Sequence, residues 1–202
     1  MNYRHIYHAG NFADIVKHLV LISILEQLKK KEKPFAVLDA FTGLGLYDLN
    51  SEAASKTLES DTGINKLLQA TDPIPQLLQT FLNIINIAGK SHYPGSPFII
   101  KQLLRPNDRL IACELHPSDY LSLKKLLPND THNIDAYNDI DLTPQSWINR
   151  LNNIDIVINV SGVLTSSHAI ILAMFMSMIQ RLYLRLAPLL TYKELFIFQL
   201  LE

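Results

Sequence analysis

Cysteine is almost absent from this chain, since Cys113 is the only one among its 202 residues. A lone thiol cannot form an internal disulfide, and it cannot supply a cysteine-rich zinc site. A disulfide framework is therefore excluded, and the chain fits the reducing cytoplasm.

Long apolar segments are also missing. The first ten residues, MNYRHIYHAG, have no apolar core behind their basic residues, so a secretory signal is not expected. The most apolar run, residues 169–179, is too short to cross a bilayer and predicts a core helix instead. We therefore expect a cytoplasmic protein with no membrane partner.

An excess of positive charge is the third absence. The chain has 18 Lys and Arg against 19 Asp and Glu, so a nucleic-acid partner would need a local basic face. Apolar residues make up 48% and charged residues 18% of the sequence, which is typical of a soluble globular protein. This length predicts a single domain over residues 1–202.

Strands and helices are predicted to alternate along the chain. Short apolar runs predict strands at residues 34–41, 109–114, 134–137 and 154–162. Helical spacing and helix-start residues predict helices at residues 13–31, 117–127, 144–151 and 166–186. Residues 50–92 lack strand alternation and predict a helical insertion that breaks at Pro73 and Pro75. The alternation indicates an α/β fold with a parallel sheet of the Rossmann type.

The turn after the first predicted strand is a candidate ligand site. Asp39 ends that strand, and Gly43 and Gly45 would let the backbone approach a ligand closely. The turn is not GxGxxG, so it either binds a nucleoside-type cofactor or is a plain connection. Glu114, at the end of the second predicted strand, could accept hydrogen bonds from ribose hydroxyls or be a solvated carboxylate. Together, Asp39 and Glu114 suggest S-adenosylmethionine rather than a dinucleotide.

Three further features each allow two interpretations. The loop at residues 93–97 is stiffened by two prolines, and Ser96 within it either caps the following helix or contacts a ligand. His18, inside the first predicted helix, is a core-facing or a solvated histidine by its spacing alone. The basic run at residues 29–33 is interpreted as a solvated helix end in preference to an RNA contact.

The amino-terminal residues mix aromatic and basic side chains. Tyr3 could stack on an RNA base, and Arg4 could contact phosphate. A metal site built from His5 and His8 lacks supporting ligands, so no metal is expected.

Four blocks of the sequence resemble one protein family in content, order and spacing. They are YRHIYHAGNFADIVKH (3–18), LDAFTGLGLYDL (38–49), YPGSP (93–97) and ELHPSDY (114–120). The chain is thereby similar, over about its first 140 residues, to the bacterial ribosomal RNA large subunit methyltransferase J family. That family has also been described as a protein involved in catabolism of external DNA.

The resemblance implies a Rossmann-like enzyme with a helical insertion that uses S-adenosylmethionine to methylate N6 of an adenine in 23S rRNA. The expected partner is protein-free 23S rRNA or an early assembly intermediate, and a monomer is expected. By position, the residues that match cofactor-contacting residues of the family are His18, Ser96 and Glu114. Tyr3 matches a residue that handles the target RNA, and Phe41 replaces a cofactor-contacting histidine. Asp139 aligns with an acid near the cofactor adenine, but Ile140 follows it where the family has glycine.

The match fails at the catalytic block. Amino-N6 methyltransferases carry [D/N]PP[Y/F] after the fourth strand, where the first residue accepts a hydrogen bond from the adenine amine and the aromatic stacks on the base. Here Asn159 keeps the first role, while Val160, Ser161 and Gly162 replace the prolines and the aromatic. The lost stacking is worth roughly 1–3 kcal/mol, so we expect a turnover lower by orders of magnitude.

Residues 155–202 diverge from the family, and no family motif follows Val160. Charge also falls there, because the only charged residues after position 150 are Asp155, Arg181, Arg185, Lys193, Glu194 and Glu202. Truncation, degeneration or a frame shift of a family member would each explain why residues 155–202 diverge. The alternative to an active enzyme is therefore a catalytically inactive remnant that binds cofactor or RNA.

The stretch IDIVINVSG (154–162) also resembles the NNAG strand end of short-chain dehydrogenases. An NAD(P)-dependent oxidoreductase would need TGxxxGxG near the start of the chain and YxxxK after this strand. Neither pattern is in the sequence, which argues against that class.

Overall fold

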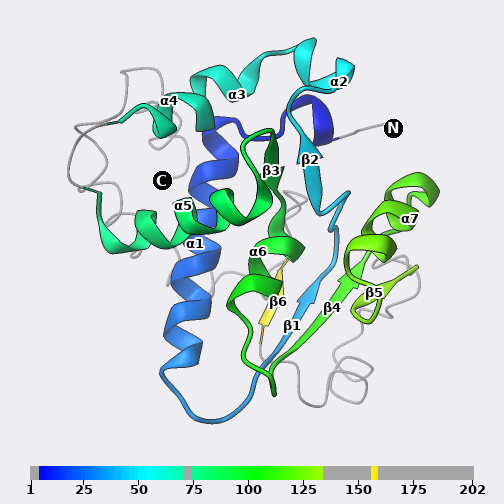
Figure 1. The fold of residues 1–202 in the computed structure, drawn as a ribbon. Helices are drawn as coiled ribbons and strands as arrows, with labels where there is room; N and C mark the ends of the chain where they lie inside the picture. Colours follow the sequence, from blue (N-terminus) through cyan, green and yellow to red (C-terminus); the bar gives the residue numbers. More distant parts are fainter. Residues whose placement is uncertain (1–4, 71–73, 134–155, 159–202) are drawn as a thin grey trace, which may run out of the picture. The chain divides into compact units, whose positions relative to one another are not determined.

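The computed structural model describes residues 5–70, 74–133 and 156–158. All of them belong to one compact unit, residues 1–161. The elements in chain order are η1 (His5–Tyr7), α1 (Phe12–Lys29), β1 (Ala36–Asp39), β2 (Leu46–Asp48), α2 (Glu52–Ser55), α3 (Glu59–Thr62), α4 (Ile64–Leu68), α5 (Gln76–Ala88), β3 (His92–Pro94), α6 (Ser96–Leu103), β4 (Arg109–Cys113), α7 (Pro117–Leu126), β5 (Thr131–His132) and β6 (Ile156–Ile158). Figure 1 shows them in place.

A parallel sheet forms the centre of this unit. Its strand order is β5-β4-β1-β6, with Val37 of β1 paired to Leu110 of β4 on one side and to Ile156 of β6 on the other. Every residue of β1 is buried, as expected for a central strand of a parallel sheet. The predicted α/β class with a parallel sheet is therefore confirmed, and three predicted strands are found as β1, β4 and β6.

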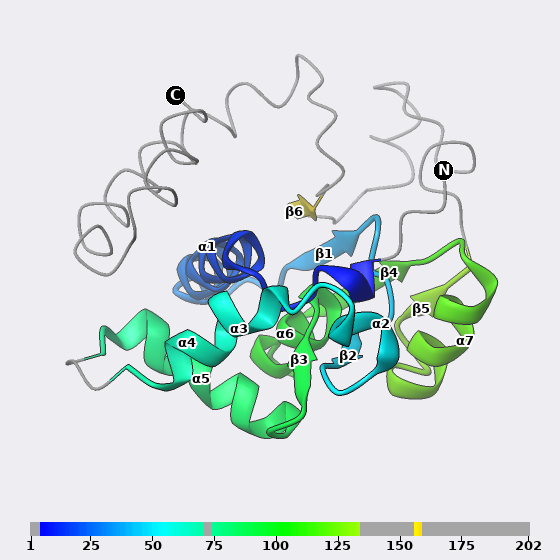
Figure 2. The same ribbon diagram turned by 90° about the horizontal axis from the view of Figure 1, so that it is seen from above.

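Helices α1, α6 and α7 lie on one side of these strands (Figure 2). Asn11 begins α1 as predicted, because its side-chain oxygen accepts a hydrogen bond of 2.8 Å from the backbone N–H of Asp14. The apolar side of α1 is fully buried at Leu19, Ile22 and Leu25. The helix ends at Lys29, two residues before the predicted end.

The helical insertion is attached by a two-stranded ribbon that the sequence did not predict. Strands β2 and β3 pair antiparallel, with Tyr47 opposite Tyr93, and helices α2 to α5 lie between them in the chain. The strands have three residues each, too short for an alternating pattern to be recognised. The predicted break is confirmed, since α5 begins directly after Pro75 and buries one apolar side.

Several predicted elements lie outside the described residues: the strand at 134–137 and the helices at 144–151 and 166–186. No helix among the described residues is long and apolar enough to span a membrane.

Candidate functional site

The carboxyl ends of β1 and β4 bring the two predicted acids to one edge of the sheet. Asp39 is the last residue of β1 and pairs with Ala112, and Glu114 directly follows the end of β4. Ligands of open α/β sheets bind outside the carboxyl ends of the strands. The geometry therefore places Asp39 and Glu114 at the same edge of the sheet.

Asp39 is the most unusual group at this edge. Its side chain is fully buried, and neither carboxylate oxygen has a hydrogen-bond partner in the part of the chain that the structure describes. Burial raises the pKa of Asp39 to about 6, and the nearby charge of Glu114 adds to this rise. Ser96 and the Phe41 backbone act on the carboxylate in the opposite sense, yet neither makes a hydrogen bond of good geometry. An unpartnered buried acid is expensive, which makes Asp39 a candidate ligand-binding residue.

The loop after β1 is held rigidly against β4. The backbone N–H and the hydroxyl of Thr42 both donate to the carbonyl of Cys113, at 3.2 and 2.9 Å. Gly43 has φ +61°, and a Cβ added there would lie 2.3 Å from the Tyr47 hydroxyl. A side chain at position 43 would therefore be strained and would have to displace the Tyr47 hydroxyl.

The Glu114 carboxylate is oriented by two backbone N–H groups. Gly43 donates to one of its oxygens at 2.7 Å, and His116 donates to the other at 2.7 Å. The side chain is half-buried. Each carboxylate oxygen can accept more than one hydrogen bond, so Glu114 can still accept from the hydroxyls of a ligand.

Ser96 lies at the amino-terminal end of α6 and does not cap it. The residue before the helix is Gly95, and no side chain makes a capping hydrogen bond there, so the capping interpretation of Ser96 is wrong. Gly95 instead donates its N–H to the carbonyl of Gly45 at 2.9 Å. This hydrogen bond joins the start of α6 to the loop after β1 that contains Gly43 and Gly45, called the glycine loop below. The Ser96 side chain is thereby placed beside Asp39.

His18 faces the core from α1, as one of its two interpretations predicted. Its Nδ1 lies 2.8 Å from the Tyr93 hydroxyl, and the two rings stack with centroids 5.4 Å apart. Burial lowers the pKa of His18 to about 4, so the imidazole is neutral near pH 7. The side chain of His18 is 7% exposed, so the ring lies almost entirely within the core.

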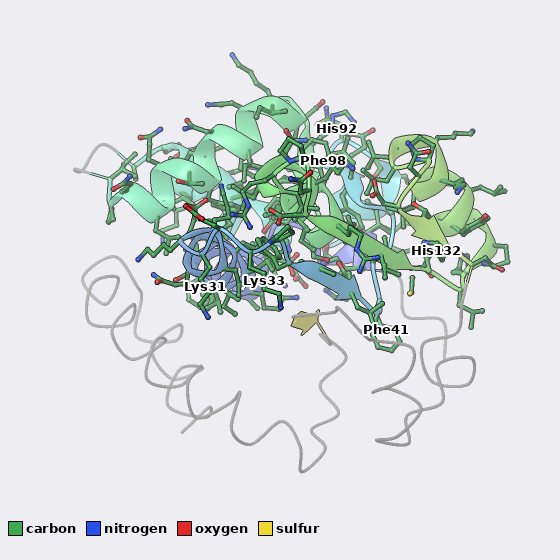
Figure 3. All side chains as sticks on the ribbon, turned by 90° about the horizontal axis from the view of Figure 1, so that it is seen from below. Lys31, Lys33, Phe41, His92, Phe98 and His132 are labelled. Atoms are coloured by element: carbon green, nitrogen blue, oxygen red, sulfur yellow. The ribbon has the colours of Figure 1, made fainter. Side chains whose placement is uncertain are left out.

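Phe41 and the basic run at residues 29–33 lie at different places on the unit. Figure 3 shows Phe41 well apart from Lys31 and Lys33. Phe41 is 37% exposed beyond the end of β1, whereas Lys31 and Lys33 precede the start of β1 at the opposite edge of the sheet. Any RNA contact by that basic run would therefore be remote from Asp39.

The remaining predicted site residues, Tyr3, Arg4, Asp139 and Asn159, lie outside the described residues. His5 and His8 contact different carboxylates, Asp14 and Glu59, each at 2.8 Å. Across residues 5–70 and 74–133, no group of three His, Cys, Asp or Glu side chains could hold a metal ion.

Sequence reasoning missed two residues near this edge. Asp14 is buried, accepts hydrogen bonds from His5 and from the Gly10 backbone, and lies 2.7 Å from Lys17 Nζ. Burial by itself would raise the pKa of Asp14, but His5, His18 and Lys17 hold it far below its ordinary value. Tyr47 packs against the glycine loop and against the edge of the His5 ring. The sequence could have indicated Asp14, because it is a charged residue in the first turn of an otherwise apolar helix.

These features define an α/β protein with a candidate ligand site at the carboxyl edge of a parallel sheet. The model of the family described as ribosomal RNA large subunit methyltransferase D, RlmJ, matches residues 32–142. The chain belongs to this family, and the resemblance stated from the sequence is confirmed.

Two curated relatives are both ribosomal RNA large subunit methyltransferase J. The protein of Escherichia coli (strain K12) is 44% identical over 135 residues, which is 65% of this chain and 48% of the relative. The protein of Haemophilus influenzae is 44% identical over 135 residues, 64% of this chain and 48% of the relative. The chain thus spans about half the length of the curated relatives that it matches.

The fold is similar to a crystal structure of a Legionella pneumophila protein. The TM-score is 0.62 at 31% identity, and the match covers 77% of this chain and 59% of that protein.

Proposed function

We propose that this protein binds S-adenosylmethionine at the carboxyl edge of its sheet and transfers the methyl group to N6 of an adenine in 23S rRNA. The observation that carries the proposal is the buried, unpartnered carboxylate of Asp39 beside the oriented carboxylate of Glu114. Membership of a methyltransferase family supplies the reaction class.

The order of the strands supports a Rossmann-like domain. Numbered along the chain within the sheet, β1, β4, β5 and β6 are the first to fourth strands, so their spatial order is 3-2-1-4. This order is part of the doubly wound arrangement, in which the crevice beside the first strand binds nucleotides.

The residues present fit the chemical groups of this cofactor. Asp39 would hold the cationic amino group of the methionine part, which would remove the cost of its unpartnered charge. Glu114 would accept hydrogen bonds from the ribose hydroxyls, and Gly43 would allow close backbone approach. His18 Nε2 and the Ser96 hydroxyl are further polar contacts within this proposal, as is Asp139 near the cofactor adenine.

When bound, S-adenosylmethionine supplies an electrophilic methyl group on its sulfonium sulfur. Asn159 would accept a hydrogen bond from the adenine amine and orient its nitrogen, as the family motif implies. Tyr3 and Arg4 would handle the RNA by stacking and phosphate contact. The substrate is proposed to be 23S rRNA, either protein-free or in an early assembly intermediate. The protein is proposed to act as a monomer.

A second candidate function is binding of cofactor or RNA without methyl transfer. It is favoured by one observation, the Val160-Ser161-Gly162 sequence where the family has two prolines and an aromatic residue. Without them the acceptor carbonyl is not preorganised and the base loses its stacking partner.

Calorimetry on the full chain tests the cofactor site. S-adenosylmethionine and S-adenosylhomocysteine should both bind, and Glu114→Gln should weaken binding about tenfold, because an amide offers one acceptor oxygen instead of two anionic ones. The matched control is Glu52→Gln, since Glu52 is 88% exposed and forms an ion pair with Lys56, just after α2. No heat with either ligand at millimolar concentration would overturn the proposed site.

A labelled-cofactor assay on a protein-free 23S rRNA transcript separates the two candidate functions. Methyl incorporation that maps to N6 of one adenine supports the enzyme. Cofactor binding without incorporation identifies the chain as the non-catalytic alternative.

A further inference from the structure

Two buried tyrosines lie opposite each other on the ribbon of β2 and β3, which follows directly from the glycine loop. Tyr47 of β2 pairs with Tyr93 of β3, and both side chains are buried. Residues directly opposite each other on an antiparallel pair project from the same side of it. The Tyr93 hydroxyl lies 2.8 Å from His18 Nδ1, whereas the Tyr47 hydroxyl contacts the glycine loop. The ribbon that attaches the insertion therefore also packs against the candidate ligand edge.

The Tyr47 side chain packs closely against the glycine loop and the start of α6. Its hydroxyl occupies the space beside Gly43, because a Cβ added there would lie only 2.3 Å from it. Its ring carbon Cε2 would lie 3.0 Å from a Cβ added at Gly95, whose N–H donates to the Gly45 carbonyl at 2.9 Å. Burial raises the pKa of Tyr47, and a contact from the Leu44 backbone acts against this rise. The hydroxyl therefore lies against two consecutive residues of the loop.

Gly43 joins this contact to Glu114. The Gly43 N–H donates to one carboxylate oxygen of Glu114 at 2.7 Å. Thr42, just before Gly43, is held by two hydrogen bonds of 3.2 and 2.9 Å to the Cys113 carbonyl. The Tyr47 hydroxyl contacts the loop directly after that anchor. The direction of the Gly43 N–H therefore depends on both contacts, and the orientation of the Glu114 carboxylate depends on that N–H.

Tyr47 is placed to act on a ligand through the loop and not by direct contact. Its side chain is only 3% exposed, so it is enclosed by protein. A binding group must be held to within about 0.5 Å of its productive position by the packing and hydrogen bonds of the residues behind it. Tyr47 lies behind the residue that donates to Glu114, which is the place such a supporting residue must occupy.

We propose that Tyr47 is a positioning residue of the cofactor site, whose hydroxyl holds Gly43 so that the Gly43 N–H keeps the Glu114 carboxylate directed toward the ribose. The inference rests on the proposed function, because it takes Glu114 as the acceptor for the ribose hydroxyls. It adds a residue of the ribbon to that site. It also locates the effect of this residue in the recognition of the ribose and not of the methionine part.

Calorimetry on the full chain with two ligands tests this role. The ligands are S-adenosylhomocysteine and its analogue that lacks the 2′- and 3′-hydroxyls. Tyr47→Phe should weaken binding of S-adenosylhomocysteine about fivefold, the effect of one misdirected hydrogen-bond acceptor. It should change binding of the analogue by less than about twofold, because the analogue has no ribose hydroxyl for Glu114 to accept from. A tyrosine that only stabilises the fold would affect both ligands alike.

A double-variant comparison tests the route through Glu114. Once Glu114→Ala has removed the carboxylate, Tyr47→Phe should weaken S-adenosylhomocysteine binding by less than about twofold further, because the two changes remove one interaction. Tyr93→Phe is the control for this coupling, since it removes a buried hydroxyl from the opposite position of the same ribbon. Any loss that it causes should be the same with and without Glu114.

Tyr7→Phe is the matched control for binding, since it removes the same atom from a half-buried ring of η1. It should bind both ligands like the unmodified chain. Urea denaturation shows whether each variant is folded. If Tyr47→Phe does not fold, Gly43→Ala displaces the same hydroxyl from the loop side and should show the same difference between the two ligands.

Three results would overturn the positioning role and leave the proposed function standing. They are unchanged binding by Tyr47→Phe, equal weakening of the two ligands, and a loss that is the same with and without the Glu114 carboxylate. If the unmodified chain binds neither ligand, the proposed function fails and this inference fails with it.

Discussion

Two buried aspartates lie at opposite ends of the same pair of strands, and their surroundings differ. Asp108, just before β4, accepts hydrogen bonds from the Phe35 and Arg105 backbone N–H groups and from the Arg105 guanidinium, at 2.8 to 3.0 Å. Asp39, at the end of β1, is 0% exposed against 8% for Asp108, and it has no hydrogen-bond partner among the described residues.

The electrostatic consequences are opposite in sign. Burial would raise the pKa of Asp108, but the Arg105 guanidinium and two backbone N–H groups hold it below its ordinary value. Burial raises the pKa of Asp39 to about 6, and the groups around it compensate only in part. A satisfied buried acid stabilises the fold, whereas an unsatisfied one costs stability and is retained where a ligand needs it. The amino edge is therefore structural, and the carboxyl edge is proposed to be functional.

The largest expected effect is on cofactor binding. Asp39→Asn should weaken S-adenosylmethionine binding about hundredfold, since a desolvated charge contact would be lost. Asp108→Asn should leave the affinity of the folded protein unchanged, because Asp108 lies at the other end of the strands. Titration calorimetry measures both, and equal losses in the two variants would abolish the distinction between the edges.

The next effect is on folding. Asp108→Ala should lower the free energy of unfolding by about 2 kcal/mol, because the buried Phe35 N–H and the Arg105 donors lose their acceptor. Urea denaturation measures this loss. Glu52→Ala, which removes an exposed pair with Lys56, should change the stability by less than about 0.5 kcal/mol. A loss for Asp108→Ala as small as this control would contradict the structural role.

The pH dependence of stability distinguishes the two acids directly. The folded-state pKa of Asp39, about 6, exceeds its ordinary value of 3.8, so its favourable contribution is complete below pH 4 and is lost as the pH rises through 6. The loss is on the order of 3 kcal/mol. His18, whose pKa falls from 6.5 to about 4, changes stability in the opposite sense over the same range.

The contribution of Asp39 is therefore measured as the difference in the free energy of unfolding between the unmodified chain and Asp39→Asn, by urea denaturation from pH 4 to pH 7. The variant should become the more stable of the two as the pH rises. A difference that does not change with pH would show that Asp39 has an ordinary pKa.

The smallest expected effect is at the glycine loop. Gly43→Ala should cost about 1–2 kcal/mol of stability, because it combines a left-handed backbone with a clash against the Tyr47 hydroxyl. The matched background is Tyr47→Phe, which removes the hydroxyl that lies 2.3 Å from a Cβ added at Gly43. Thermal unfolding should show a smaller loss for Gly43→Ala in the Tyr47→Phe background than in the unmodified chain, and equal losses would show that the hydroxyl does not limit the space.

The sequence predicted those parts of the fold that depend on local pattern. Helix α1 begins at the predicted Asn11 cap, and β1 and β4 fall within the predicted strands, because capping and apolar runs act over a few residues. The β2–β3 ribbon was not predicted, because its pairing joins Tyr47 to Tyr93 across the whole insertion. The interpretation of Ser96 as a helix cap was wrong, because Gly95 occupies the position before the helix.

For the site, the sequence by itself determined the family, the acids at the ends of two strands and the glycines between them, since these are residue types at fixed spacings. Only the tertiary structure decided that Asp39 is buried without a partner while Asp108 is fully bonded, since burial and hydrogen bonding depend on what distant segments bring to each end of the sheet. The same holds for Glu59, an ordinary acid in the sequence, whose two oxygens bind His8 and Asn11 only because the insertion folds back onto the amino-terminal segment.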